Sequence, residues 1–158
     1  MNESINCVIM PITNGKILVP NATVAAMVSF TEVGPADGYP DFILGLTTWQ
    51  GWHMPLLSMS KMLGLCDEES FQQARIAVIK TIGNGQQLPY YGLLLQGFPR
   101  LTEIHEENII LAETSQQSFA AIDQNADTLL TQVEQLGEPV WIPNLVRLSE
   151  LVKVKMDD

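Results

Sequence analysis

One stretch of this chain, residues 42–65 with the sequence FILGLTTWQGWHMPLLSMSKMLGL, constrains the fold more than any other. Its first eight residues alternate between two faces, which is the period of a β-strand. Gln50-Gly51 predicts a tight turn, and residues 52–57 predict the returning strand of a hairpin. Trp49 falls on the face opposite the leucines of the first strand, so we expect its indole to point away from the main core.

The rest of the stretch predicts a sharp end to this hairpin. Pro55 lacks a backbone N–H, so it marks the edge or the end of the second strand. Ser58 is placed to cap a short helix, and Gly64 is placed to end it. The stretch also carries three methionines, Met54, Met59 and Met62. Methionine repacks easily and suits an adaptable recognition patch, but core packing under the hairpin is the favoured interpretation.

Further strands are predicted on both sides of this stretch. They are residues 8–12, 17–19, 28–30, 75–83 and 90–96. Asn14-Gly15, between the first two, is a strong hairpin signal, because both central residues of such a turn need positive φ. The segment 22–27, ATVAAM, suits about one helical turn, and the Gly-, Pro- and Asp-rich residues 31–41 predict a loop.

The C-terminal part of the chain has the same order of elements as the first hairpin. Residues 128–152, like residues 42–65, contain a strand, a glycine turn, a strand with proline, a polar cap and a short apolar helix. The second helix is predicted at 144–152, with Asn144 as its cap. This hint of duplication suggests two similar small β-barrels, and it favours a strand at 128–136, where the pattern also fits a helix. The polar segment 97–127 predicts a long loop that holds at most one loose helix and a short strand at 101–104.

Composition limits the functions open to this chain. Its 158 residues suffice for one domain, or for two small lobes that share a core. Hydrophobic residues make up 46% and charged residues only 16%, which leaves apolar surface to cover and favours a protein that binds partners. The net charge of −10 and the eight scattered Lys and Arg residues argue against nucleic acid and against an anionic membrane surface as partners.

The expected location is the cytoplasm. The chain starts without the basic segment of a signal peptide, and no apolar run approaches the roughly 20 residues of a membrane-spanning helix. Cys7 and Cys66 are too few for a disulfide framework. We therefore expect a reduced, cytoplasmic protein with no direct membrane insertion.

Few residues suggest catalysis or metal binding. His53 and His105 are the only histidines, and neither has a cysteine neighbour at a metal-ligand spacing. The favoured interpretation of His53 is an exposed strand residue. Carboxylates gather at 67–69 and 103–107, in predicted loops where solvated charge is a better explanation than acid–base catalysis. We expect no catalytic, cofactor-binding or metal-binding residues.

The tryptophans that flank the turn, Trp49 and Trp52, are the strongest candidates for a binding surface. Tryptophan is common at interface hot spots and costly to leave in water. Partner contact and structural packing are equally good interpretations of this pair. A small-ligand pocket would need convergent polar groups, and only His53 and Gln50 lie nearby.

The same stretch resembles the CheW-like family of chemosensory coupling proteins. The match lies in Gly45-Leu46-x-x-Trp49-x-Gly51-x-x-x-Pro55-Leu56-Leu57-Ser58, followed by Met62-Leu63-Gly64-Leu65. The family carries G-V-x-N-L-R-G-x-x-x-P-V-V-D-L-x-x-x-L-G-L at this place, in the same order and spacing. ILVP upstream and ARIAVIK, YYGLLLQ and VWIPNLVRLSEL downstream also follow the family's order, so the resemblance spans residues 5–152.

The resemblance implies a mainly β fold: two SH3-like five-stranded β-barrels with short helices, packed intimately into a single CheW-like domain over residues 1–158. It implies a non-catalytic adaptor without a cofactor, which couples the cytoplasmic tips of chemoreceptors to the regulatory domain of a CheA-type histidine kinase. Such adaptors work at membrane-associated receptor arrays, in chemotaxis or twitching motility. Val24 falls where the family places an apolar receptor contact. The expected partner-binding residues are Val24, Met27, Trp49, Gln50, Gly51 and Trp52.

The chain departs from the family pattern at several positions. Gln50 stands where the family's arginine usually lies, Trp49 replaces a leucine, and Gly97-Phe98-Pro99 replaces an apolar-acidic V-D-E-V run. The W-x-G sequence is similar to adaptors of type IV pilus chemosensory systems, the PilI and ChpC type. Glutamine lacks the five-donor fork of arginine. An accessory adaptor that competes in the array or caps it, without activating the kinase, is therefore one alternative, and a small-ligand-binding β-barrel is another.

Overall fold

The computed structural model of the chain describes residues 4–30, 33–34, 38–81, 89–105, 110–111, 130–135, 138–143, 145 and 149. One group of strands comprises β1 (Ser4–Ile12), β2 (Gly15–Pro20), β8 (Arg100–His105), β9 (Ile110–Leu111), β10 (Leu130–Gln135) and β11 (Glu138–Pro143). The other comprises β3 (Val24–Ser29), β4 (Ile43–Trp49), β5 (Trp52–Leu57), β6 (Arg75–Lys80) and β7 (Tyr90–Leu95). Short helices within the described ranges include η1 (Asn21–Thr23) and α1 (Met59–Met62).

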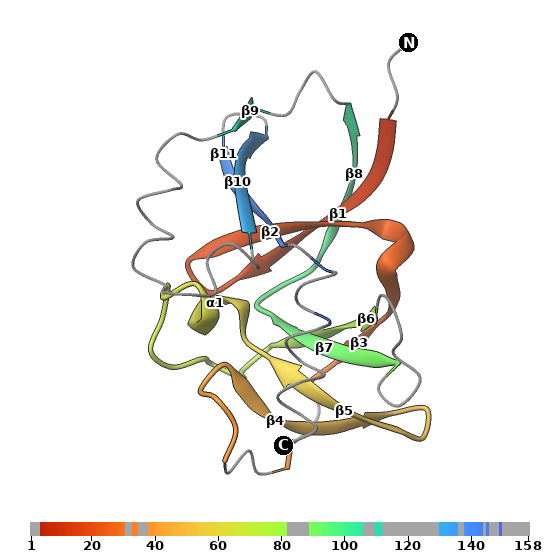
Figure 1. The fold of residues 1–158 in the computed structure, drawn as a ribbon, viewed down its shortest axis with the longest axis vertical. Helices are drawn as coiled ribbons and strands as arrows, with labels where there is room; N and C mark the ends of the chain where they lie inside the picture. Colours follow the sequence, from red (N-terminus) through yellow and green to blue (C-terminus); the bar gives the residue numbers. More distant parts are fainter. Residues whose placement is uncertain are drawn as a thin grey trace.

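These strands form two sheets, which occupy the upper and lower halves of Figure 1. The upper sheet has the order β8-β1-β2-β11-β10-β9, and the lower sheet has the order β3-β6-β7-β5-β4. The prediction of a mainly β fold built from two small β units is confirmed. The lower unit has the expected five strands, and the upper unit has a sixth, the two-residue strand β9.

Both hairpins predicted from turn signals are present. β1 pairs antiparallel with β2, but the turn is centred on Thr13 and Asn14, because Gly15 already pairs with Ile12. Only Asn14 has a positive φ there, of 64°, so the prediction of positive φ at both Asn14 and Gly15 is wrong. β4 pairs antiparallel with β5 around Gln50-Gly51, whose φ values are 48° and 83°. Positive φ at both central residues is the geometry of a type I′ turn, whose twist matches that of the flanking strands.

Two local predictions are wrong. Pro55 does not mark the edge or end of its strand, because it lies inside β5, which is flanked by β7 and β4. Residues 22–27 do not form a helical turn. The 3₁₀ helix η1 ends at Thr23, and β3 begins at Val24 and pairs with β6. Pairing with a distant strand overrides the helix preference of the alanines in this segment. The expected strands at 101–104 and 128–136 are confirmed as β8 and β10. Most of the predicted loop 97–127 and most of the predicted helix 144–152 lie outside the described residues.

Buried apolar side chains form three clusters. The central cluster joins the two sheets, with Met10 from β1 and Leu93 from β7 among its members. The upper cluster, which includes Ile9, lies on the other face of the upper sheet. The lower cluster, which includes Leu56, lies on the other face of the lower sheet. Adjacent residues such as Ile9 and Met10 thus enter different clusters, as the alternation of a β-strand requires.

Tyr91 lies wholly inside the central cluster. Burial raises the pKa of its phenol far above the usual value, and the Ser149 side chain opposes this shift. Ser149 is itself buried and helical, so the C-terminal part of the chain contributes to the core between the sheets.

The helix α1 follows the β4–β5 hairpin and has both predicted caps. The Ser58 hydroxyl accepts a hydrogen bond of 3.0 Å from the backbone N–H of Lys61. At the other end, Gly64 has a φ of 72°. The N–H groups of Gly64 and Leu65 donate to the carbonyl oxygens of Lys61 and Ser60, respectively. This pair of bonds is a Schellman motif, which satisfies carbonyls that the end of a helix leaves unpaired.

The tip of the β1–β2 hairpin docks onto α1. The Ser60 hydroxyl donates a hydrogen bond of 2.8 Å to the Thr13 carbonyl oxygen. The Asn14 side-chain amide donates one of 2.9 Å to the Leu65 carbonyl oxygen. These bonds connect the upper sheet to the helix that ends the lower hairpin.

Glu69, in the loop after α1, strengthens the same junction. Its carboxylate accepts hydrogen bonds of 2.5 Å from the hydroxyls of Thr13 and Ser58. It also accepts one of 3.3 Å from the Gln96 amide, at the end of β7. The neighbouring carboxylates Asp67 and Glu68 are exposed, as predicted, but Glu69 is half-buried and structural.

Glu69→Gln is expected to lower the free energy of unfolding by about 2 kcal/mol. An amide offers one acceptor oxygen and places an N–H₂ group where a hydroxyl now donates, so at least one of the 2.5 Å bonds is lost. Urea unfolding followed by circular dichroism measures the change. Glu68→Gln is the matched control at an exposed position and should change stability by less than about 0.5 kcal/mol. Equal stability of the two variants would contradict the role given to Glu69.

Candidate partner-binding surface

The β4–β5 hairpin presents the turn expected to contact a partner. Trp49 and Trp52 lie directly opposite each other across it. Gln50 and Gly51 are exposed at its tip. Antiparallel pairing and the type I′ geometry hold this tip in one shape, so a partner can bind it with little loss of conformational entropy.

The two tryptophans differ in exposure. Trp49 points away from the central cluster, as predicted, but it is half-buried against the lower cluster. Its ring meets Tyr90 edge-to-face, with centroids 4.9 Å apart. Trp52 is 44% exposed, and its ring centroid lies 6.3 Å from that of Tyr90. Structural packing therefore accounts for Trp49, and Trp52 is the better candidate for partner contact.

Val24 and Met27, the other two candidates of the sequence analysis, lie on β3. Both are half-buried and pack against the central cluster. In a regular strand, residues three apart lie on opposite faces. The register of β3 against β6 shifts between Val24 and Ala26, and this bulge returns Met27 to the face of Val24. Val24 and Met27 therefore lie on the same face of β3, the face that packs on the central cluster.

The structure does not bring the hairpin tip and the β3 pair together. β3 and β4 are opposite edges of the lower sheet, with β6, β7 and β5 between them. Val24 and Met27 pack on the central cluster, whereas Trp49 packs on the lower cluster. The six candidate residues thus form two surfaces, which allows contact with two different partners.

The two histidines were not expected to form a metal or catalytic site. His53 is exposed on β5, as predicted. His105 ends β8, and its side chain is outside the described set. Among the described residues, no group of three His, Cys, Asp or Glu side chains is arranged to hold a metal ion.

The sulfur-containing residues near the hairpin are structural. Met54, Met59 and Met62 are buried, which confirms their interpretation as core residues. Cys7 and Cys66 are free thiols. Burial raises the pKa of both, and the negative charge of Glu69 adds to the shift at Cys66. Raised thiol pKa values mean little thiolate, so neither cysteine is primed as a nucleophile.

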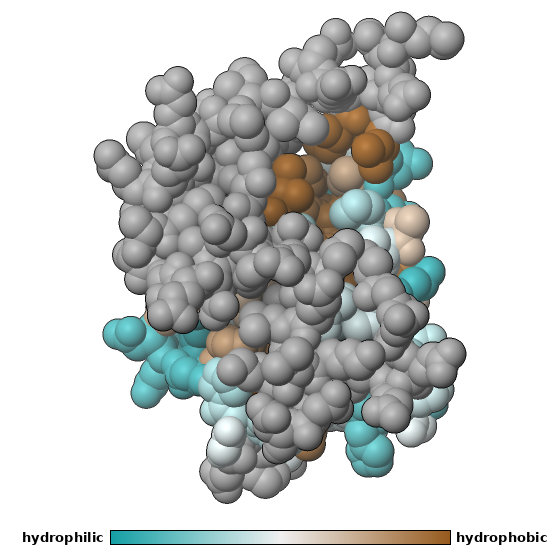
Figure 2. All heavy atoms as spheres, in the orientation of Figure 1, coloured by the Kyte–Doolittle hydropathy of each residue, from teal (hydrophilic) through white to brown (hydrophobic). Residues whose placement is uncertain are grey.

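Sequence reasoning missed several exposed apolar side chains. Phe98 is 75% exposed just after β7, and the guanidinium carbon of Arg75 lies 3.9 Å from its ring centroid. The only sequence signal for this contact was the Gly-Phe-Pro departure from the family pattern. Ile5 on β1 and Leu101 on β8 are also exposed. Figure 2 shows apolar atoms at the surface in the upper half of the molecule. The strand periodicity of Ile5 and Leu101 does not distinguish them from core residues.

Comparison with known proteins identifies the fold. The structure matches the crystal structure of the scaffolding protein TtCheW from Thermoanaerobacter tengcongensis, with a TM-score of 0.69 and 15% identity over 89% of each chain. No curated protein sequence matches the chain significantly. None of the described helices has the length and apolar character needed to cross a membrane.

The sequence itself matches the CheW-like domain family over residues 6–150, which is most of its length. The motif of the β4–β5 hairpin and α1, from which the resemblance was first inferred, lies inside this match. The chain therefore belongs to the CheW-like family of non-catalytic scaffolding adaptors of chemosensory systems, in agreement with the expectation that it is not an enzyme.

Proposed function

We propose that this chain is an adaptor that couples chemoreceptors to a CheA-type histidine kinase in a chemosensory array. The observation that carries this proposal is the CheW-like match over residues 6–150. The shared fold with a scaffolding protein, TtCheW, supports it. Such an adaptor works in the cytoplasm, at membrane-associated receptor arrays that control chemotaxis or, for a member of the type IV pilus group, twitching motility.

Two surfaces give this role a physical basis. The regulatory domain of the kinase binds the β4–β5 tip, where the exposed ring of Trp52 supplies apolar area and Gln50 and Gly51 supply backbone and amide groups. The cytoplasmic tip of a receptor binds near Val24 and Met27 on β3. The placement of β3 and β4 at opposite sheet edges supports simultaneous binding, because neither partner needs to cover the other surface.

The two sheets act as lobes of a single domain in this proposal. The central cluster takes side chains from both sheets, and Glu69 joins the β1–β2 hairpin to α1 by hydrogen bonds. A domain of this kind holds its two partner surfaces at a fixed separation. A fixed separation is what a scaffold needs in order to keep receptor and kinase in register.

Gln50 favours a second candidate function, that of an accessory adaptor which competes in the array or caps it without activating the kinase. An arginine at the tip would offer a planar fork of five donors to a carboxylate, whereas glutamine offers one neutral amide. Gln50 is exposed at the turn and has a φ of 48°. Because its side chain lies in solvent, an arginine at this position would reach a partner without a change of fold.

Kinase autophosphorylation in a reconstituted mixture tests both candidates. The mixture contains this chain, a receptor signalling fragment and the CheA-type kinase of the same organism. Stimulation of the kinase that needs both this chain and the receptor supports the coupling adaptor. Binding without stimulation, together with stimulation by Gln50→Arg, supports the accessory adaptor. No binding to kinase or receptor would overturn both.

A further inference from the structure

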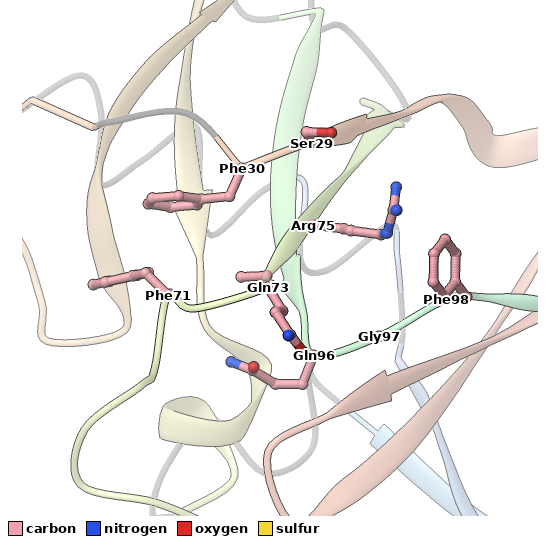
Figure 3. Close-up of a pocket in the computed structure, with 9 residues that line it drawn as sticks. Ser29, Phe30, Phe71, Gln73, Arg75, Gln96, Gly97 and Phe98 are labelled. Atoms are coloured by element: carbon pink, nitrogen blue, oxygen red, sulfur yellow. The ribbon is translucent and has the colours of Figure 1, made fainter.

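Phe98 forms an exposed aromatic ridge after the end of β7. Three-quarters of its side chain is exposed to solvent. Arg75, the first residue of β6, lies against the ring, and Figure 3 shows its side chain directed towards Phe98. A guanidinium that stacks on an aromatic face keeps its in-plane N–H groups available for a further partner. The contact therefore holds Arg75 in position without using its hydrogen-bonding capacity.

A hollow lies on each side of this ridge. The larger, of about 650 Å³, is bordered by Arg75 and by the stacked rings of Phe30 and Phe71, whose centroids are 4.8 Å apart (Figure 3). The smaller, of about 170 Å³, is bordered by Lys16 and Arg100. Phe98 lines both hollows, so a bound segment that crosses the ridge would reach the aromatic stack on one side and cations on the other.

The charge around this ridge is opposite to that of the whole chain. Three of the eight Lys and Arg residues line the two hollows, Lys16, Arg75 and Arg100, in a chain whose net charge is −10. Among the residues that the structure describes, no Asp or Glu lines either hollow. Within the described part of the chain, no carboxylate forms an ion pair with Arg75 or Arg100. An apolar ridge bordered by such cations is complementary to apolar side chains flanked by carboxylates.

We propose that the Phe98 ridge binds an acidic segment of a partner protein. An apolar side chain of that segment packs on Phe98 and beside Phe71, and its carboxylates pair with Arg75 and Arg100. Arginine suits this role because its planar fork binds a carboxylate through two parallel hydrogen bonds. A protein segment fits better than a small anion, because a small anion would leave the exposed aromatic area in water. This surface is separate from the β4–β5 tip and adjoins the end of β3, because Ser29 lines the larger hollow.

Peptide titration of the isotope-labelled full chain, followed by NMR, tests the proposal. The probe is an eight-residue peptide with Leu-Phe at its centre and three Asp or Glu residues on each side. The comparison peptide has Asn and Gln in place of those acids. The acidic peptide is expected to shift the backbone amide resonances of Arg75, Phe98 and Arg100, and to bind at least tenfold more tightly than the amide peptide. Equal binding of the two peptides, or shifts centred on the β4–β5 tip instead, would overturn the proposal.

Substitutions at the ridge give a second measurement. Phe98→Ser, Arg75→Gln and Arg100→Glu are each expected to weaken binding of the acidic peptide at least fivefold. Lys80→Glu, at the exposed opposite end of β6, is the matched charge control and should change it less than twofold. Thermal unfolding shows that each variant is folded before its affinity is compared. If Lys80→Glu weakens peptide binding as much as the ridge variants do, the effect is one of net charge, and the proposal is overturned. The proposal is also overturned if inorganic phosphate binds the same residues as tightly as the acidic peptide, because the site would then be a small-anion site.

Discussion

Gly45→Ala is expected to lower the free energy of unfolding by about 3 kcal/mol, the upper end of the usual cost of overpacking. A Cβ atom at Gly45 would overlap the backbone carbonyl oxygen of Gly34 and would lie 2.9 Å from a methyl carbon of Val33. Gly34 is held there by its N–H, which donates to the Leu46 carbonyl oxygen at 2.8 Å. A methyl group at Gly45 must displace backbone, so this hydrogen bond and the packing of Val33 on the lower cluster are weakened together.

Chemical denaturation of the parent and of two alanine variants measures this effect. Gly34→Ala is the matched control, because its Cβ would lie 3.7 Å from the nearest atom, an ordinary contact distance. We expect the control to change stability by less than about 0.5 kcal/mol. A Gly45→Ala variant as stable as the control would mean that the segment containing Val33 and Gly34 moves aside easily. The glycine of the family-like motif would then need another explanation.

Gly45 also illustrates how far the sequence predicts this fold. Local sequence signals predicted a feature correctly where the residues that determine it lie within a few positions of one another. The Gln50-Gly51 turn, the Ser58 cap and the Gly64 terminus depend on interactions between near neighbours, and all three are present. The reason for Gly45, in contrast, is a carbonyl oxygen in a preceding loop, which no short-range pattern indicates.

Pairings between distant segments were beyond the reach of local patterns. Residues 22–27 have weak preferences, and β6 decides their conformation by pairing with them as β3. Two parallel contacts also join distant strands, β2 with β11 and β5 with β7. The internal duplication and the resemblance to the CheW-like family together supplied the arrangement in two β units, because alternation alone cannot say which strand lies beside which.

The sequence predicted only part of the candidate surface, because the rest depends on contacts between distant segments. The hairpin sequence marked Trp49 and Trp52 together but could not rank them, since their exposure depends on Tyr90 in β7. Arg75 and Phe98 carry no motif and meet only because the start of β6 lies beside the end of β7. A surface assembled from separate strands becomes visible when the sheet order is known.

Trp52→Ala is expected to weaken binding to the regulatory domain of the kinase about 30-fold, the roughly 2 kcal/mol typical of an interface hot spot. The ring is 44% exposed in the free chain and is the largest apolar group at the tip, so a partner that covers it removes much apolar area from water. Its nearest aromatic neighbour, Tyr90, is 6.3 Å away between centroids, so the variant should lose little stability. Isothermal titration calorimetry measures the affinity without using tryptophan as the probe.

Two alanine variants distinguish contact from folding in this experiment. His53 is the exposed neighbour of Trp52 on β5, but its side chain points to the opposite face of the strand, so His53→Ala should bind as the parent does. Trp49→Ala should lose about 2 kcal/mol of stability, because the ring packs on Tyr90 and the lower cluster. Weak binding by Trp49→Ala could thus result from lost stability or from a lost contact, whereas weak binding by a stable Trp52→Ala results from a lost contact alone. If Trp52→Ala and the parent bind the kinase equally, the hairpin tip is not the kinase surface, and the contact must lie elsewhere on the chain.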